Sequence, residues 1–313
     1  MNIVDFELCH VELATQIAKQ SYEKERRYVP ALPSVDSIPD LAEYAKNRLG
    51  VSAFEGDVMV GFLCVIGPFE NAFRSTNAIG VFSPMGANGA VGEKRADIYA
   101  RMYQVAAKKW VESGATSHSI CLYAHDKLVQ EKFFQYGFGI RCMDAIQMMN
   151  ETDTLTCHEH ITRELSKEEY QLIFPLNKLL VQHLNSSPSF MCYPFIHDAK
   201  LLEMIMQSDA RYFVTIHDEQ IVSYIKISNE GENFACSASD MMNISGAYCL
   251  PEYRGMGVFK NLLDFVIKKL RSEGYIRLGV DFESINPNAY HFWLKYFEAY
   301  TNGVVRRVDE FAL

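Results

Sequence analysis

The chain has 313 residues, of which 49% are hydrophobic and 22% are charged, which is enough for two domains of ordinary size. Its formal net charge of −9 argues against nucleic acid as a main partner, because phosphate-backbone binding needs a basic face. We expect neither a secretory signal nor a membrane span, since no apolar stretch has the required form or length. The eight cysteines are scattered without a C-x-x-C pair, which favours reduced, mostly buried thiols in a cytoplasmic protein.

The first half of the chain shows an ordered series of helical and strand patterns. The expected helices lie near residues 11–27, 38–48 and 93–113, with a short one that includes residues 133–138. The expected strands are 51–55, 58–66, 78–84 and 119–123, and the first two form a hairpin around the polar turn Gly56-Asp57. Strand-like residues close this half.

The second half repeats the same order of elements. Its expected helices lie near residues 167–184, 198–207 and 255–273, with a short one that includes residues 293–298. Its expected strands are 212–216, 220–227, 244–250 and 277–282. A repeat of about half the chain predicts two similar domains. The polar segment 149–156 divides them, so we assign the domains to residues 1–150 and 151–313.

One turn in the second half predicts a phosphate site. Residues 250–259 read LPEYRGMGVF and join a strand to a long amphipathic helix. Glycine lets the backbone take a positive φ and lets a ligand approach the backbone amides closely. The first amides of a helix have no internal partner and lie at the positive end of its dipole. Arg254 adds a fixed cation beside them.

This motif and the element order resemble the GNAT superfamily of acetyl-CoA-dependent N-acetyltransferases. The family motif, Arg/Gln-x-x-Gly-x-Gly/Ala, follows a strand that ends in x-x-Pro-Glu-Tyr. Arg254 and Gly257 match it, Gly255 completes the usual Arg-Gly pair, and Phe259 replaces the final small residue. The resemblance implies an α/β mixed-sheet protein with two tandem GNAT-like acyl-CoA N-acyltransferase domains and acetyl-CoA as co-substrate.

The resemblance also implies a set of cofactor contacts. The amides from Arg254 to Lys260 would hold the pyrophosphate, and the strand before them would pair with the pantetheine as though it were another strand. Amides near its end would polarise the thioester carbonyl. The implied cofactor-binding residues are Tyr248, Cys249, Leu250, Arg254, Gly255, Met256, Gly257, Val258, Phe259, Lys260 and Asn286.

The implied proton donor departs from the family pattern. Asn286 and Ala289 match the start of the family's fourth helix, but the position of its tyrosine falls on Trp293. An indole N–H cannot deliver a proton to a leaving thiolate. Tyr290 and Tyr296 lie three residues to either side, and we take Tyr296 as the catalytic candidate.

Carboxylates on one strand are the candidates for the base. Asp281 and Glu283 alternate with apolar residues on the strand that borders the site in the family, and either could accept the proton of the amine. A solvated strand end is the alternative for each. Asp240 is a third, similar candidate. Cys249 could carry an acyl group, although direct attack by the amine needs no such residue.

The first half keeps Gly137-Phe138 of the family pattern but loses the phosphate motif. Ala87 follows Pro84 as Arg254 follows Pro251, and residues 86–92 form a glycine-rich stretch in which an anion could still bind. We expect a degenerate GNAT-like domain here. His158 and His160 share a face of a probable strand, but no third ligand is apparent, so we expect no metal site.

These features together predict an N-acetyltransferase that moves acetyl from acetyl-CoA to a primary amine of a small molecule or peptide by direct attack. The alternative is a non-catalytic acyl-CoA-binding or regulatory protein on the same scaffold. We expect no nucleic-acid or membrane partner. The chain would be a monomer, with its two domains as a pseudo-dimer, or a homodimer.

Overall fold

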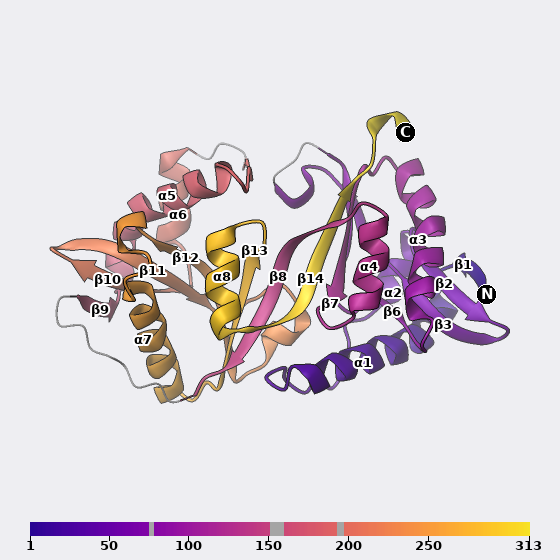
Figure 1. Ribbon diagram of the computed structural model, residues 1–313, viewed down its shortest axis with the longest axis horizontal. Helices are drawn as coiled ribbons and strands as arrows, with labels where there is room; N and C mark the ends of the chain where they lie inside the picture. Colours follow the sequence, from indigo (N-terminus) through magenta and orange to yellow (C-terminus); the bar gives the residue numbers. More distant parts are fainter. Residues whose placement is uncertain (75–77, 151–159, 193–196) are drawn as a thin grey trace.

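The computed structural model describes residues 1–74, 78–150, 160–192 and 197–313 (Figure 1). The α-helices are α1 (Val11–Tyr28), α2 (Ala42–Lys46), α3 (Arg95–Glu112), α4 (Lys127–Gln135), α5 (Phe174–Asn185), α6 (Asp198–Met206), α7 (Val258–Ser272) and α8 (Pro287–Tyr296). The strands are β1 (Asn2–Asp5), β2 (Val51–Glu55), β3 (Val58–Leu63), β4 (Ile66–Phe69), β5 (Gly80–Ser83), β6 (Asn88–Ala90), β7 (Ser117–Tyr123), β8 (Gly139–Met148), β9 (Ile161–Glu164), β10 (Arg211–His217), β11 (Gln220–Ser228), β12 (Met241–Cys249), β13 (Arg277–Glu283) and β14 (Glu298–Arg307). None of the described helices is both long and apolar enough to cross a membrane.

The predicted order of elements is confirmed in both halves, with local differences at prolines and glycines. The helix predicted at 167–184 is a 3-10 segment, η3 (Lys167–Ile173), followed by α5, because Pro175 lacks the N–H that a continuous helix would use. The short helix predicted around 133–138 ends before Gly137, whose φ of 79° is typical of a helix C-terminus.

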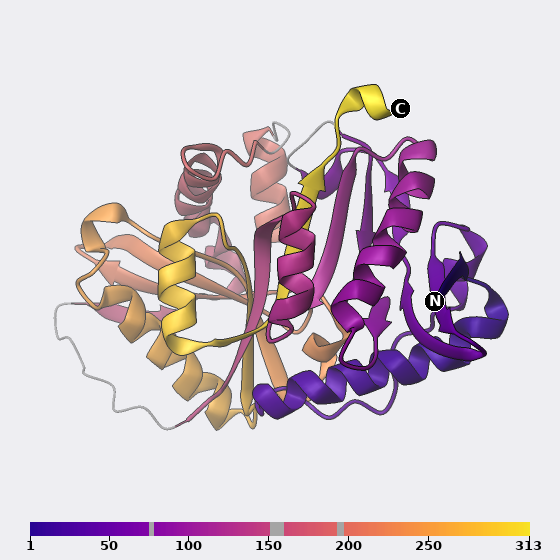
Figure 2. The same cartoon turned by 45° about the vertical axis from the view of Figure 1, so that its right-hand side comes forward.

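The sheets join the two halves more closely than the repeat predicts. One sheet has the order β1-β2-β3-β6, and a second has the order β4-β5-β7-β14-β8-β13-β12-β11-β10-β9. The last strand of the chain, β14, therefore lies between β7 and β8, and β8 lies beside β13 (Figures 1 and 2). The final strand of each half therefore pairs with a strand of the other half. The boundary at residue 150 remains a prediction, because β8 and β14 each pair with a strand from the other side of it.

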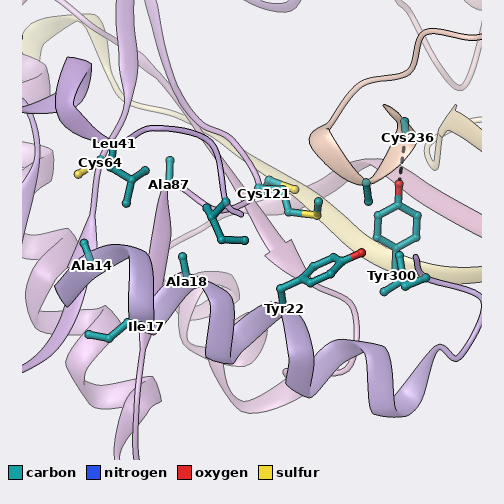
Figure 3. Close-up of a cluster of buried hydrophobic side chains, with 14 of the residues drawn as sticks. Ala14, Ile17, Ala18, Tyr22, Leu41, Cys64, Ala87, Cys121, Cys236 and Tyr300 are labelled. Atoms are coloured by element: carbon teal, nitrogen blue, oxygen red, sulfur yellow. Dashed lines mark hydrogen bonds between the residues drawn. The ribbon is translucent and has the colours of Figure 1, made fainter. Parts of the chain in front are cut away.

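A shared core supports this exchange. Helix α1 runs along one edge of the molecule (Figure 1), and its Ala14, Ala18 and Tyr22 are fully buried. The same cluster contains Cys236, from the 3-10 segment η4 (Phe234–Ser237) before β12, and Tyr300 of β14 (Figure 3). Burying these side chains together removes apolar surface of both halves from water, so the two halves stabilise each other.

Candidate functional site

The second half contains a gap between two diverging strands. Strands β12 and β13 pair in parallel only from Met241↔Arg277 to Ile244↔Val280. Beyond that point β12 continues beside β11 as far as Cys249, and β13 continues beside β8 as far as Glu283. Among the described residues, no strand pairs with the facing edges of these two segments. Their backbone groups are placed to pair with another extended chain.

A register shift marks the start of the gap. Lys226 of β11 lies opposite Gly246, whereas the next residue, Ile227, lies opposite Ile244, so Ser245 has no partner. A bulge of this kind bends a strand and increases its twist. Here it turns the last residues of β12 away from β13.

The predicted glycine turn lies at the end of β12. A 3-10 turn, η5 (Pro251–Tyr253), leads into it, and α7 begins at Val258. Gly255 and Gly257 have φ of 74° and 83°, and a Cβ added to either would meet nothing within 4 Å. The glycines are therefore needed for the backbone conformation and not for packing. They leave the first amides of α7 open to a ligand.

Arg254 is held over the end of β12. Its Nε donates to the carbonyl oxygen of Cys249 at 2.9 Å, and its Cζ lies 5.3 Å from the centre of the Tyr248 ring. A positive charge thus lies at the mouth of the gap, next to the glycine turn. Met256, between the glycines, is 69% exposed.

The remaining predicted residues of the turn face inward. Phe259 packs against Phe292 and Trp293 of α8, with ring centres 4.9 and 5.9 Å apart. Its ring therefore points into the core and not toward the open amides. Lys260 forms an ion pair with Asp264 one turn further along α7, so its charge is already balanced.

Asn286 and His183 close the gap from the side. Asn286 is buried and caps α8 by accepting the amide of Asn288. His183, near the end of α5, lies with Nε2 3.3 Å from Asn286 Oδ1, and its ring centre is 6.4 Å from that of Tyr248. The imidazole therefore touches both walls of the gap. The sequence does not reveal His183 as a site residue, because a single histidine on a helix gives no local sign of a distant partner.

Carboxylates gather on the β13 side of the gap. Asp281 lies directly opposite Asp144 in the β13–β8 register. Asp281 is exposed to solvent, yet desolvation by the surrounding protein, and then the charges of Glu232 and Asp144, raise its pKa to about 7. Burial likewise raises the pKa of Asp144 to about 6, although hydrogen bonds from Thr301 and Asn233 oppose this. This concentration of negative charge favours a cationic ligand.

Glu283 shares the β13 face of Asp281, because side chains alternate along a strand. Its Oε1 lies 3.4 Å from Arg141 Nη2, whereas its Oε2 is buried without a hydrogen-bond partner among the described residues. Burial raises the pKa of Glu283, and the Arg141 charge partly offsets this. A buried, unpaired carboxylate oxygen is costly to keep, which is expected where a ligand supplies the missing donor.

Asp240, the third acidic candidate, has a structural partner. It forms an ion pair with Arg277 at the opposite end of β13 from Glu283, and its carbonyl oxygen accepts the amides of Ile276 and Arg277. Asp240 therefore anchors the start of β13 and does not face the gap.

The comparisons with known proteins agree with this geometry. Residues 179–298 match the model of the acetyltransferase (GNAT) family. Over the whole chain, the fold resembles a GCN5-related N-acetyltransferase from Sphaerobacter thermophilus, with a TM-score of 0.60, 9% identity, and coverage of 98% of this chain and 95% of that one. Residues 179–298 therefore form a GNAT-family domain, and the chain as a whole has the fold of a GNAT protein.

Two further solved GNAT structures have lower TM-scores. A GNAT-family acetyltransferase from Colwellia psychrerythraea has a TM-score of 0.46 and 11% identity, over 99% of this chain and all (100%) of that one. A GCN5-related N-acetyltransferase from Kribbella flavida has a TM-score of 0.43 and 10% identity, over 99% of this chain and 72% of that one. No curated protein matches the sequence.

Among the described residues of the first half there is no comparable gap. Its parallel pair, β5 with β7, ends at Ser83↔Ile120, but the side chain of Asn88 occupies the space beyond. Asn88 Nδ2 donates to Ser83 Oγ at 3.0 Å and to the carbonyl oxygen of Cys121 at 3.1 Å. Its Oδ1 accepts from Tyr99 Oη at 2.8 Å. The carbonyl oxygen of Cys121 on this edge is thus satisfied by a side chain of the protein itself.

The turn before α3 also differs from the turn before α7. Residues 86–92 are not one loop, since the strand β6 forms their centre, and the prediction of a continuous glycine-rich loop is wrong. The position that corresponds to Val258, the first residue of α7, is Arg95 and not a residue near Ala87. Arg95 makes a bidentate ion pair with Asp126 at 2.6 and 2.8 Å. The charge of Arg95 is therefore neutralised by Asp126 at the start of α4.

Tyr296 and Cys249 are two further predicted site residues of the second half. Tyr296 lies at the end of α8, packed against Phe292 and beneath the ammonium groups of Lys260 and Lys295. Burial raises the pKa of the Cys249 thiol to about 11, so the thiol stays protonated near neutral pH. This disfavours a nucleophilic thiolate at Cys249.

Seven of the eight cysteines, and His160 of the histidine pair, lie among the described residues. Cys64, Cys121, Cys236 and Cys249 are buried, whereas Cys9, Cys142 and Cys192 are exposed, and all seven are free thiols. The prediction of buried thiols therefore holds for the first four only. Cys157, His158 and Glu159 lie outside the described residues.

Proposed function

We propose that the second half transfers acetyl from acetyl-CoA to a primary amine of a small molecule or peptide, while the first half is degenerate. The observation that carries this proposal is the unpaired β12 edge beside the open amides of residues 255–260; the Arg254 amide itself donates to the carbonyl oxygen of Pro251. Cys249 would pair with the pantetheine next to Tyr248, and Asn286 would border it. The predicted pairing with Leu250 does not fit, because the Leu250 amide donates to the carbonyl oxygen of Val222 at 2.9 Å. The pyrophosphate would lie on the glycine turn, beside Arg254. The Asn88 and Arg95 contacts of the first half support a single cofactor site.

The amine would approach from the acidic side of the gap. Glu283 Oε2 would accept a hydrogen bond from the bound ammonium, and Asp281 would take the proton that the amine must lose. A base with a pKa near the working pH is the most effective, and the pKa of Asp281 is about 7. The neutral amine would then attack the thioester carbonyl directly, and the Cys249 amide would polarise that carbonyl. Tyr296 is the proton donor that the sequence predicts.

A second candidate is a non-catalytic acyl-CoA-binding or regulatory protein. The observation in its favour is Trp293, which is 5% exposed at the position of the family's tyrosine. This candidate predicts that acetyl-CoA binds but that no amine releases free thiol.

The free thiols and the absence of a spanning helix among the described residues also suit the cytoplasmic location that we propose.

Arg254→Ala should weaken acetyl-CoA binding about 10- to 100-fold, because a charge-assisted hydrogen bond contributes about 1.5–3 kcal/mol. Isothermal titration calorimetry of the wild type and the variant measures this directly. Arg101→Ala, an exposed arginine on α3, is the control and should bind as the wild type does. One site per chain supports a degenerate first half, two sites contradict it, and no binding to the wild type rejects the proposed function.

Gly257→Ala should weaken acetyl-CoA binding and lower the free energy of unfolding by about 1–2 kcal/mol, since alanine is strained at positive φ. Gly92→Ala is a matched control, because Gly92 has nearly the same φ, 81°, and equally open surroundings just before α3. It should cost similar stability without changing the affinity. Urea unfolding and calorimetry give the two quantities. Equal losses of affinity would show that the turn before α7 has no special part in binding.

A further inference from the structure

Neither Trp293 nor Tyr296 is suited to protonate the departing thiol. When the C–S bond breaks, the electron pair stays on sulfur, and the thiolate leaves more readily if it is protonated. The Trp293 indole cannot serve, because its nitrogen does not release a proton near neutral pH. Tyr296 lies ten residues along the chain from Asn286, and a helix rises about 1.5 Å per residue, so it lies about 15 Å away along α8.

His183 lies where that proton is needed. The proposed function places the thioester beside Tyr248 and Leu250, and the His183 imidazole contacts Tyr248 on one wall and Asn286 on the other. The side chain is half-buried, so water can restore its proton after each turnover. Helix α5 therefore brings a titratable group to the gap from outside the strands that form it.

The hydrogen bond to Asn286 identifies which nitrogen carries the proton. Asn286 Oδ1 also accepts the backbone amide of Asn288 at 3.2 Å, so this atom is the amide oxygen. An oxygen without hydrogens can only accept, and His183 Nε2 must therefore be the donor in the 3.3 Å contact. The Nε2–H group is thus already directed across the gap.

We propose that His183 donates the Nε2 proton to the sulfur of the departing CoA. This step rests on the proposed function. Asp281 first passes the ammonium proton to solvent; the neutral amine nitrogen then forms its bond to the acetyl carbon and gives its second proton to Asp281. The C–S bond breaks, and the sulfur takes the proton of the His183 imidazolium. Solvent then returns a proton to His183 and removes one from Asp281, so the reaction balances to an amide and a free thiol.

The test compares His183→Gln with the wild type at saturating acetyl-CoA and amine. Glutamine keeps an N–H donor for Asn286 but cannot release its proton, so kcat should fall about 10²- to 10³-fold while the acetyl-CoA affinity stays within about threefold. The wild-type kcat should fall at alkaline pH, because a general acid must hold a proton in order to donate it, and the variant should lose this alkaline limb. Free imidazole should restore part of the activity of His183→Ala. Each of these readouts distinguishes proton transfer from a structural role.

Two tyrosine variants make the test specific. Tyr290→Phe and Tyr296→Phe should each leave the alkaline limb in place. The assignment to His183 is overturned if His183→Gln keeps its kcat and its alkaline limb, or if either tyrosine variant abolishes that limb. A wild-type chain that binds acetyl-CoA but acetylates no amine would reject the catalytic function and the role of His183 together. A wild-type chain that acetylates amines but gives an unchanged His183→Gln rejects only the role of His183.

Discussion

Asp281→Asn will lower kcat about 10²- to 10⁴-fold, the range expected when a general base is removed. The base must be ionised to accept a proton, so the wild-type rate should rise with pH through about 7, the pKa of Asp281. The variant should lack this rise. The rate of thiol release with a primary amine, measured across this pH range at saturating acetyl-CoA, gives both results. Asp57→Asn, in the exposed β2–β3 turn, is the control and should behave as the wild type does.

The same substitution should stabilise the fold at high pH. The folded pKa of Asp281 is above the ordinary aspartate value of about 3.9, so its protonated form stabilises the folded chain at low pH. That contribution is lost as the pH rises through about 7. Asparagine does not ionise, and the midpoint of unfolding of Asp281→Asn should therefore rise relative to the wild type between about pH 5 and about pH 8. If Asp281→Asn instead keeps the activity and the pH profile of the wild type, Asp281 is a solvated strand end and not the base.

The order of elements could be predicted from the sequence because it depends on local patterns. The hairpins of both halves, and the long helices after residues 95 and 258, follow from alternation, helical spacing and the residues at their ends. The glycine turn was equally local, since Gly255 and Gly257 are required by the positive φ of their own backbone. These features do not depend on what packs against them.

Other glycines are explained only by distant neighbours. Gly89 made residues 86–92 resemble a loop, yet it lies in β6 with no positive φ. A Cβ at this position would lie 2.9 Å from the Ile17 side chain and 3.1 Å from Phe62. Glycine is needed there for the close approach of α1 and β3. The composition of the segment cannot distinguish these two causes.

The contacts that complete the site could not be predicted for a similar reason. His183 meets a partner 103 residues away, and the inward rotation of Phe259 depends on aromatic residues of α8. Strand exchange is also hidden in the sequence, because side-chain alternation identifies the buried face of a strand but not its neighbour. Both β8 and β14 are suitable for either half, and only the assembled sheet decides between them.

Deleting residues 298–313 will unfold both halves of the protein and not only the second. The deletion removes β14, which pairs with β7 on one side and β8 on the other, and with it the buried side chains of Tyr300 and Val304. The backbone groups of both neighbouring strands would lose their partners. The cost exceeds the total stability of a typical domain, about 5–15 kcal/mol. Circular dichroism and urea unfolding should show no cooperative transition for the truncated chain.

A shorter deletion provides the control for this result. Removing residues 309–313 keeps the whole of β14 and the hydrogen bond from the Val308 amide to Thr116. It takes away only the exposed 3-10 turn η6 (Glu310–Ala312), whose Phe311 is 98% exposed, so stability should change by about 0.5 kcal/mol or less. If the longer deletion instead unfolds cooperatively with the first half intact, the two halves are independent domains. The exchange of β8 and β14 would then be dispensable, and the boundary at residue 150 would be a true domain boundary.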